Sequence, residues 1–427
     1  MRTLLVLVCL AFCCSSAHAD RARFQFLRTV KVSELNAILN AERATFLNGV
    51  NQDAGYELPA VPKAKKAVDL YSVRYYSSSP ELGGQEMLAS GLLALPAGAS
   101  NTKLNLLAYL HGTVMGKYAV PSFAFQRDNP SGYDYYNDAF ETRYMVALFA
   151  GNGYAVMAPD YFGMGAGAAF DEAYMIKQTT AQGNYDLYLD VVKFLASKKI
   201  KPAHLMVGGW SQGGLNTTGL LEILEARGVE VRAAFTAASP NDPYATMNAS
   251  VFHPRAADAP WLSALLALTA FSCENYLGPE GLAKAVINPQ YYADMKAIYE
   301  RTTGGPPGLA LLVGRWVSEG IPFTDFFRPA YRDPSTLANS RFGQCLKLNE
   351  TYRQEFKTPL RMYYGTADQV IRPVIGRLGH DYQQRITDTP DAPSSSKITA
   401  IPVEGAGHSL TFISATADAK AWMDSLR

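Results

Sequence analysis

Residues 205–214 read LMVGGWSQGG, an apolar run that leads into a G-x-S-x-G motif centred on Ser211. The run at 205–209 predicts a buried β-strand, and the pattern of 213–227 predicts a helix directly after it. A G-x-S-x-G motif between a strand and a helix is typical of a sharp turn that exposes the serine hydroxyl above a sheet. The glycines at 209 and 213, two positions before and after the serine, permit such a turn. Ser211 is therefore the candidate nucleophile.

A serine nucleophile needs a histidine that takes its proton, because the hydroxyl alone is weakly nucleophilic at neutral pH. His408 is the best placed candidate, since it follows a strand predicted at 397–403 within the sequence GAGH. His204 lies at the opposite end of the nucleophile strand. His253 falls in an inserted segment, and His380 falls in a predicted surface helix. We therefore predict that His408 is the base.

The histidine is usually oriented by an acid, which in this chain order lies between the serine and the histidine. Asp368 meets that condition, because it ends the sequence GTAD in a tight loop after a strand predicted at 360–364. Asp381 and Asp388 lie on less constrained polar stretches. Asp160 precedes the serine and is interpreted as structural. Asp368 is therefore the predicted acid.

The negative oxygen that forms during acyl transfer needs two backbone N–H donors. One comes from the residue after the nucleophile, here Gln212. The other comes from the loop after the third strand, which here follows strands predicted at 70–77 and 87–95. The sequence His111-Gly112-Thr113 ends the apolar strand predicted at 104–110, and we predict Thr113 as the second donor. His111 is expected to order this loop without transferring a proton.

Strand patterns and helical patterns alternate from residue 70 onward, which favours an α/β fold with a mostly parallel sheet flanked by helices. Strand signals are absent from the sequence at 241–357, so we expect a helical insertion there. Before residue 70 we expect an extension with a single helix that opens at Ser33 and ends near 51–55. The predicted organisation is a signal peptide (1–19), an N-terminal extension (20–69), a first core part (70–240), an inserted helical lid or cap (241–357) and a second core part (358–427).

The N-terminus has the features of a secretory signal. An apolar run at 4–14 follows a basic residue, and residues 17–19 read AHA, which matches the small residues that signal peptidase accepts. The run is too short to span a bilayer, and a phenylalanine precedes Cys13, which argues against a lipoprotein. No later segment is apolar enough to span. We expect residues 1–19 to be removed and the protein to be secreted.

Removal of the signal leaves Cys273 and Cys345 as the only cysteines, and an oxidising compartment favours a disulfide between them. Neither cysteine has nearby in sequence the cluster of ligands that a metal site needs, and no cofactor is expected. The 427 residues carry 39 basic and 38 acidic side chains. This balance offers no attractive field for nucleic acid, so we expect no nucleic-acid partner.

Five motifs together resemble the secretory lipase family of α/β-hydrolases, over most of the chain from residue 70. They are His111-Gly112-Thr113, PDYFG at 159–163, GWSQGG at 209–214, YGTAD at 364–368 and GH at 407–408. Within that family the chain is most similar to the secreted, cell-wall-directed lipase/esterases of xanthomonad plant pathogens. The resemblance implies a serine ester hydrolase with a lid-like insertion over the active site. Its partners would be small-molecule or lipid esters, including sugar-bearing ones, or esters of the plant cell wall.

Two other functions remain open on the sequence alone. A serine exopeptidase can share this fold and motif, although such enzymes more often have tyrosine at the position of Gln212. Recognition of a free amino terminus would also require paired acids near the pocket. A non-catalytic secreted binding protein on a hydrolase scaffold is the other alternative. Loss of activity normally removes a member of the triad, whereas all three candidates are present here.

Overall fold

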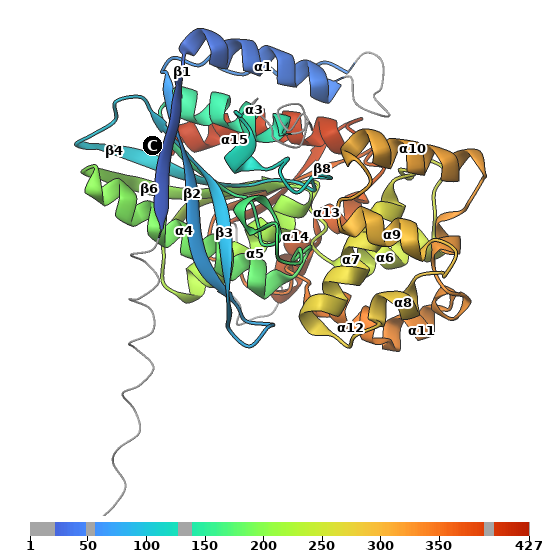
Figure 1. The fold of residues 1–427 in the computed structure, drawn as a ribbon. Coiled ribbons are helices and arrows are strands. Elements are labelled where there is room, and N and C mark those ends of the chain that lie inside the picture. The colour runs from blue at the N-terminus through green and yellow to red at the C-terminus, as the bar shows by residue number, and fades with distance from the viewer. Residues whose placement is uncertain (1–21, 48–55, 127–138, 388–396, 427) are drawn as a thin grey trace, which may run out of the picture.

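The computed structural model describes residues 22–47, 56–126, 139–387 and 397–426. The predicted signal peptide, residues 1–19, lies outside these ranges. The described chain forms one sheet with helices on both faces and a group of helices at one side (Figure 1). The α/β architecture predicted from the alternation of strand and helix signals is therefore confirmed.

Within the described residues, nine strands form the sheet in the order β1-β2-β3-β5-β4-β6-β7-β8-β9. Antiparallel pairings join β1, β2, β3 and β5, and parallel pairings join β5, β4, β6, β7, β8 and β9. The bounds are β1 (Arg23–Val30), β2 (Val68–Ser79), β3 (Gln85–Pro96), β4 (Thr102–Leu110), β5 (Ala155–Pro159), β6 (Ile200–Trp210), β7 (Val231–Ala237), β8 (Leu360–Gly365) and β9 (Ile398–Val403).

Helices cover both faces of the sheet (Figure 1). One face carries α1 (Val32–Leu47), α3 (Phe140–Phe149) and α15 (His408–Ser425), which pack against one another. The other face carries α4 (Lys177–Ser197) and α5 (Gln212–Ala226). The remaining core elements are α13 (Pro373–Gly376), α14 (Leu378–Thr387) and the short 3-10 helices η2 (Pro121–Phe123), η3 (Ala150–Asn152) and η4 (Gly165–Gly167). No helix in the described ranges is both long and apolar enough to cross a membrane.

The central strands are apolar because helices bury both of their faces. All five residues of β5 are buried, and so are the last seven residues of β4. The side chains of these strands alternate between the two apolar clusters that lie on either face of the sheet. Since β4, β6 and β8 are parallel, their carboxyl ends meet at one edge of the sheet, where loops can bring distant residues together.

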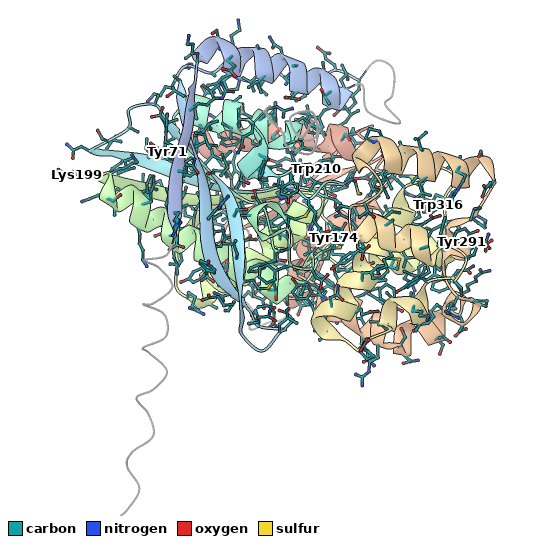
Figure 2. The ribbon with its side chains drawn as sticks, viewed as in Figure 1. Tyr71, Tyr174, Lys199, Trp210, Tyr291 and Trp316 are labelled. Carbon is teal, nitrogen blue, oxygen red and sulfur yellow. A yellow bond between two sulfur atoms is a disulfide. The ribbon has the colours of Figure 1, made fainter. Side chains whose placement is uncertain are left out.

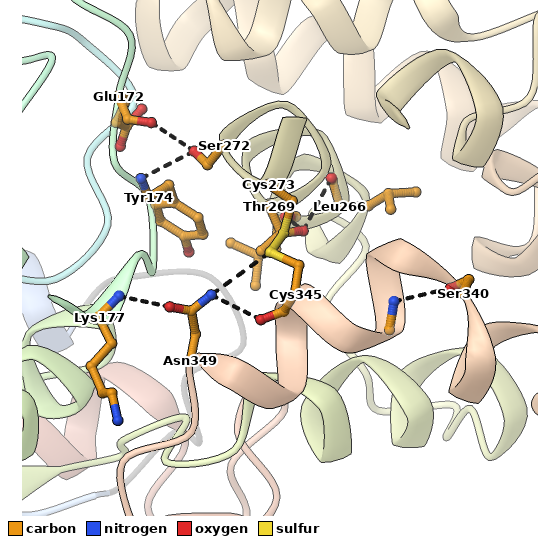
Figure 3. Close-up of a disulfide and its surroundings, with 12 residues drawn as sticks. Glu172, Tyr174, Lys177, Leu266, Thr269, Ser272, Cys273, Ser340, Cys345 and Asn349 are labelled. Atoms are coloured by element: carbon orange, nitrogen blue, oxygen red, sulfur yellow. Dashed lines mark hydrogen bonds between the residues drawn. A yellow bond between two sulfur atoms is a disulfide. The ribbon is translucent and has the colours of Figure 1, made fainter. Parts of the chain in front are cut away.

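The segment between β7 and β8 is helical, as its sequence predicted (Figure 1). Ser272 connects it to the core, because its hydroxyl donates to Glu172 O at 2.7 Å and accepts from Tyr174 N at 3.1 Å (Figure 3). The elements are α6 (Pro243–Phe252), α7 (Leu262–Leu277), α8 (Leu282–Val286), α9 (Tyr292–Tyr299), α10 (Gly305–Ser318), η5 (Phe323–Phe326), η6 (Pro329–Arg332), α11 (Pro334–Asn339) and α12 (Arg341–Leu348). We refer to α6 through α12 as the insertion.

The structure corrects one prediction about the N-terminal extension. We expected a single helix there, whereas the strand β1 precedes α1 and pairs antiparallel with β2 at the edge of the sheet. Only the last residue of β1 is buried, so the sequence of this strand lacks a clear alternation of apolar and polar residues. Its pairing partner lies more than 35 residues away, as in Val30↔Val68, and a local pattern cannot reveal such a partner. The expected helix end near 51–55 lies outside the described residues.

The predicted disulfide between Cys273 and Cys345 is present (Figure 3). It joins α7 to α12, and both cysteines are buried. Asn349 reinforces this end of α12 by donating its amide N–H to Cys345 O at 2.9 Å. The bond therefore crosslinks two helices of the insertion and does not touch the sheet.

We predict that loss of this disulfide destabilises the insertion more than the core. The bond closes a loop of 72 residues, for which the chain-entropy model gives at most about 4 kcal/mol. The double variant Cys273→Ala with Cys345→Ala should unfold at a lower temperature by calorimetry, while Ser211 still reacts with a small fluorophosphonate. Unchanged melting, or two free thiols in a peptide map of the unreduced protein, would contradict this prediction.

Candidate active site

Ser211 lies at the turn between β6 and α5, where the G-x-S-x-G motif predicted it. Its φ of 55° is positive, in a region that non-glycine residues rarely occupy and that costs of the order of 1–3 kcal/mol. A Cβ on Gly209 would approach Gly213 O to 2.2 Å, and a Cβ on Gly213 would approach Leu110 O to 1.9 Å. The two glycines therefore allow the turn to pack directly against the end of β4.

The structure brings Ser211, His408 and Asp368 into one hydrogen-bonded chain. Ser211 Oγ lies 2.9 Å from His408 Nε2, and His408 Nδ1 lies 3.0 Å from Asp368 Oδ2. When Nδ1–H is donated to the carboxylate, the neutral ring presents the lone pair of Nε2 to the serine hydroxyl. His408 and Asp368 are both buried, so water competes little for these bonds. The arrangement can accept the serine proton and stabilise the resulting imidazolium.

Backbone hydrogen bonds fix the acid and the histidine in place. Asp368 Oδ1 accepts the N–H groups of Val370 and Ile371, both at 2.8 Å, while Oδ2 faces the imidazole. Gln369 Oε1 accepts the backbone N–H of His408 at 3.1 Å, at the first residue of α15. The loop after β8 therefore orients both members of the pair.

Two further side chains hold the site, and neither was predicted from the sequence. Trp210 Nε1 donates to His408 O at 3.1 Å, and its ring lies 5.1 Å from the imidazole, centroid to centroid. Arg255 follows α6 in the insertion and donates from Nη2 to Asp368 O at 2.9 Å. Trp210 occupies the variable position of the motif, and Arg255 lies in a segment without a recognisable motif. Only the folded contacts reveal their roles.

The two predicted oxyanion donors lie beside the nucleophile on different elements. Gln212 is the first residue of α5, and Thr113 follows β4 and lines the same pocket as Ser211. Within the described chain, the backbone N–H of neither residue has a hydrogen-bond acceptor. The hydroxyl of Thr113 lies 2.9 Å from that of Tyr174. Thr113 lines the pocket, whereas Gln212 is buried and is not among the residues that line it.

Three buried titratable groups lie near the loop 111–113. Burial raises the pKa of Glu141 to about 8 and that of Asp160 to about 6, because a carboxylate is poorly solvated there. Burial also lowers the pKa of His111 to about 4, so the ring is neutral, and its Nδ1–H donates to Gly112 O at 2.7 Å. Asp160 accepts the N–H of Ser122 at 2.8 Å. These contacts support the structural roles predicted for His111 and Asp160.

A pocket of about 580 Å³ lies beside Ser211 and His408, a volume typical of small-molecule sites. It lies between the core and the insertion, and Trp210 and Tyr174 mark this boundary in Figure 2. The helix α10 contributes the apolar wall formed by Leu309, Ala310, Val313, Gly314 and Val317. Among the described residues that line the pocket, none is a carboxylate, a lysine or an arginine. The pocket therefore suits an apolar ligand.

Among the described residues, the other histidines and acids considered from the sequence do not line this pocket. His204 lies within β6, His253 follows α6, and His380 in α14 contacts Asp381, with 3.0 Å between Nδ1 and Oδ1. Asp388 lies outside the described residues. No group of three or more histidines, cysteines or acids that could hold a metal ion occurs in the part of the chain that the structure describes.

A family model described as the alpha/beta hydrolase family matches residues 109–419, which is more than half of the chain. The chain belongs to the α/β hydrolase family. The matched range includes the loop 111–113 and the three hydrogen-bonded residues Ser211, Asp368 and His408. A search of curated proteins found no match to this α/β hydrolase.

Solved structures with the same fold include hydrolases from bacteria and yeast. A candidate hydrolase from Legionella pneumophila is 18% identical, with 95% of this chain and 97% of that chain covered and a TM-score of 0.74. A ligand-bound form of the rice cell wall degrading esterase LipA from Xanthomonas oryzae is 19% identical, with 95% and 98% covered and a TM-score of 0.71. Candida antarctica lipase A is 15% identical, with 90% and 77% covered and a TM-score of 0.59. The predicted α/β-hydrolase fold is confirmed.

We predict that deprotonation of Glu141 lowers the free energy of unfolding of this α/β hydrolase as the pH rises. The folded-state pKa of Glu141, about 8, lies above its ordinary value of 4.5, so the folded state holds the proton more tightly. The free energy of unfolding should therefore fall by an amount of the order of a few kcal/mol between pH 5 and pH 8. Glu141→Gln should lose this decrease, measured by denaturant titrations of both proteins at several pH values. A pH-independent difference between the two proteins would contradict the prediction.

Proposed function

We propose that the protein is a serine carboxylic-ester hydrolase of the esterase or lipase type. The observation that carries the proposal is the chain of hydrogen bonds from Ser211 through His408 to Asp368, placed at the wall of an apolar pocket. Membership of the α/β hydrolase family supports it, and so does the fold shared with an esterase and a lipase.

In the proposed reaction, Ser211 Oγ attacks the ester carbonyl carbon while His408 Nε2 takes the hydroxyl proton. The carbonyl electrons move to oxygen, and the backbone N–H groups of Thr113 and Gln212 stabilise that negative charge. The C–O bond to the alcohol then breaks, and His408 returns the proton to the leaving oxygen. A water molecule activated by His408 hydrolyses the acyl-enzyme by the same steps, which release the acid and restore Ser211.

The pocket favours an ester over a peptide with a free amino terminus. An aminopeptidase needs negative groups that bind the ammonium, and the described pocket walls carry none. The apolar wall of α10 instead suits an acyl chain. We therefore propose acyl esters of lipids as substrates, and the similarity to the esterase LipA extends the proposal to acyl esters of the plant cell wall, with or without a sugar. A panel of esters of graded acyl length, with feruloyl and aminoacyl substrates beside them, distinguishes these classes from exopeptidase activity.

We also propose that the protein is exported after removal of residues 1–19. The support comes from the N-terminal sequence and from the buried disulfide, because disulfides persist in oxidising compartments. Sequencing of the mature protein from the culture medium should find Asp20 at the N-terminus. Retention of the unprocessed chain in the cytosol would refute export.

We predict that Asp368→Asn lowers kcat about 10³- to 10⁴-fold on a short-chain ester, because the amide cannot stabilise the imidazolium. Asp381→Asn is the matched control, since Asp381 also contacts a histidine but does not line the pocket. The control should stay within about twofold of the wild-type kcat. Equal rates for the two variants, both folded by circular dichroism, would remove Asp368 from the proposed triad.

We predict that Gly314→Leu shortens the acyl pocket. Gly314 lies in α10 and lines the pocket, and a Cβ there would meet no atom within 4 Å, so the side chain can extend into open space. Exclusion of two or three methylenes should lower kcat/KM for a dodecanoyl ester about 10- to 100-fold and leave acetyl ester hydrolysis almost unchanged. Leu311→Gln is the control, because Leu311 is 79% exposed on the same helix. An equal loss on both esters would argue against an acyl pocket beside α10.

A further inference from the structure

A buried carboxyl group lies behind the oxyanion loop, residues 111–113, and takes no part in the proposed chemistry. Glu141 is in the first turn of α3 and is 6% exposed. Both of its carboxyl oxygens accept the backbone N–H of Gly112, at 3.0 and 3.1 Å. The hydroxyl of Tyr109, near the end of β4, donates to Oε1 of the same carboxyl group. One side chain thus ties α3 to β4 and to the oxyanion loop.

A carboxyl group is an unfavourable choice at this position if its only role is to fill space. Burial raises the pKa of Glu141, and only hydrogen bonds from Tyr109 and Gly112 oppose that rise. No ion pair to Glu141 is formed by the described residues, and Arg143 on the same helix pairs with Glu42 at 2.7 Å. An apolar side chain of similar size would avoid the cost of desolvation. An apolar residue could not supply the hydrogen-bond acceptors that Glu141 offers to the N–H of Gly112.

The position of Gly112 makes that hydrogen bond relevant to the reaction. Gly112 is buried and immediately precedes Thr113, so fixing its N–H restricts the peptide group that carries the Thr113 N–H. The loop also packs closely on Trp210, because a Cβ on Gly112 would lie 2.9 Å from the indole ring. Without an acceptor, the buried N–H of Gly112 would gain by rotating toward another partner. Gly112 O accepts the Nδ1–H of His111 at 2.7 Å, so loss of the N–H bond to Glu141 would leave the peptide that carries the Thr113 N–H held on one side only.

We propose that Glu141 is a positioning residue of the oxyanion hole, which acts through Gly112 to aim the Thr113 N–H at the developing negative oxygen. The inference rests on the proposed function, because it assumes that Thr113 stabilises an oxyanion. Glu141 then affects the transition state and leaves the binding of the neutral ester largely unchanged. Its loss should lower kcat far more than it raises KM.

The experiment compares Glu141→Leu, Glu141→Gln and Tyr109→Phe with the wild type. The concentration of active sites is measured by complete reaction with a fluorophosphonate. The kcat for an octanoyl ester is then expressed per active site, so that misfolded protein does not lower the measured value. Glu141→Leu should lower kcat about 10- to 100-fold. Complete loss of an oxyanion donor lowers kcat about 10²- to 10³-fold, and a misplaced donor should cost less than that. Glu141→Gln keeps an acceptor for Gly112 and should restore kcat to within about fivefold of wild type. Tyr109→Phe leaves the Gly112 bonds in place and should retain kcat within about threefold.

A second readout reports on the oxyanion alone. An octyl trifluoromethyl ketone adds to Ser211 Oγ, the serine proton moves to His408, and the carbonyl oxygen becomes an anion in the hole. The inhibition constant of this ketone should rise in Glu141→Leu by the same factor as kcat falls, while inhibition by octanamide stays unchanged. A role of Glu141 in folding alone would move neither constant per active site.

Three results would overturn the proposal. They are an unchanged kcat per active site in Glu141→Leu, a fall in kcat without weaker ketone binding, and an equal loss in Tyr109→Phe. If Glu141→Leu does not fold, Glu141→Asp takes its place, because the shorter side chain withdraws the carboxyl group from Gly112, and kcat per active site should then fall about tenfold. Failure of the proposed function is recognised separately, since the wild type itself would then neither react with the fluorophosphonate nor hydrolyse the ester.

Discussion

The hydrogen bond between Ser211 Oγ and His408 Nε2, 2.9 Å long, joins residues that are 197 positions apart, and the sheet makes that contact possible. β6, β7, β8 and β9 are parallel neighbours, so the loops after them leave from one edge. Ser211 follows β6, Asp368 follows β8, and His408 begins the helix after β9. The insertion follows β7 at the same edge, which brings α10 to the pocket while the pairing of β7 with β8 is preserved.

The site contains several features that are unfavourable on their own. Ser211 has a positive φ, and Glu141 and Asp160 are buried acids whose pKa values are raised. Such strain persists only where the surrounding structure determines it fully. Here the apolar strands and the glycines at 209 and 213 supply that constraint, because they leave the turn at Ser211 no room to relax. The hydrogen bonds of the loops after β4 and β8 then fix the groups that act on the nucleophile.

The sequence predicted the parts of the site that depend on local chemistry. The residue order around Ser211, Asp368 and His408 was sufficient to predict that these three side chains meet, because each lies in a short motif at the end of a strand. The edge strand β1 was missed, since its evidence is a pairing with β2 far along the chain. Glu141 was missed because its partner, the N–H of Gly112, is a backbone group that leaves no mark in the sequence. The pocket wall on α10 was equally hidden, since an apolar helix in an insertion gives no sign of what it faces.

The central claim is that Ser211 is a nucleophile activated by His408. Peptide mass spectrometry after brief treatment with a fluorophosphonate tests it most directly, with His408→Asn as the comparison. We expect one adduct per folded wild-type chain, located on Ser211, and a labelling rate in His408→Asn that is lower by more than about 10³-fold. An adduct on another serine, no adduct on the folded wild type, or equal labelling of the two proteins would contradict the claim.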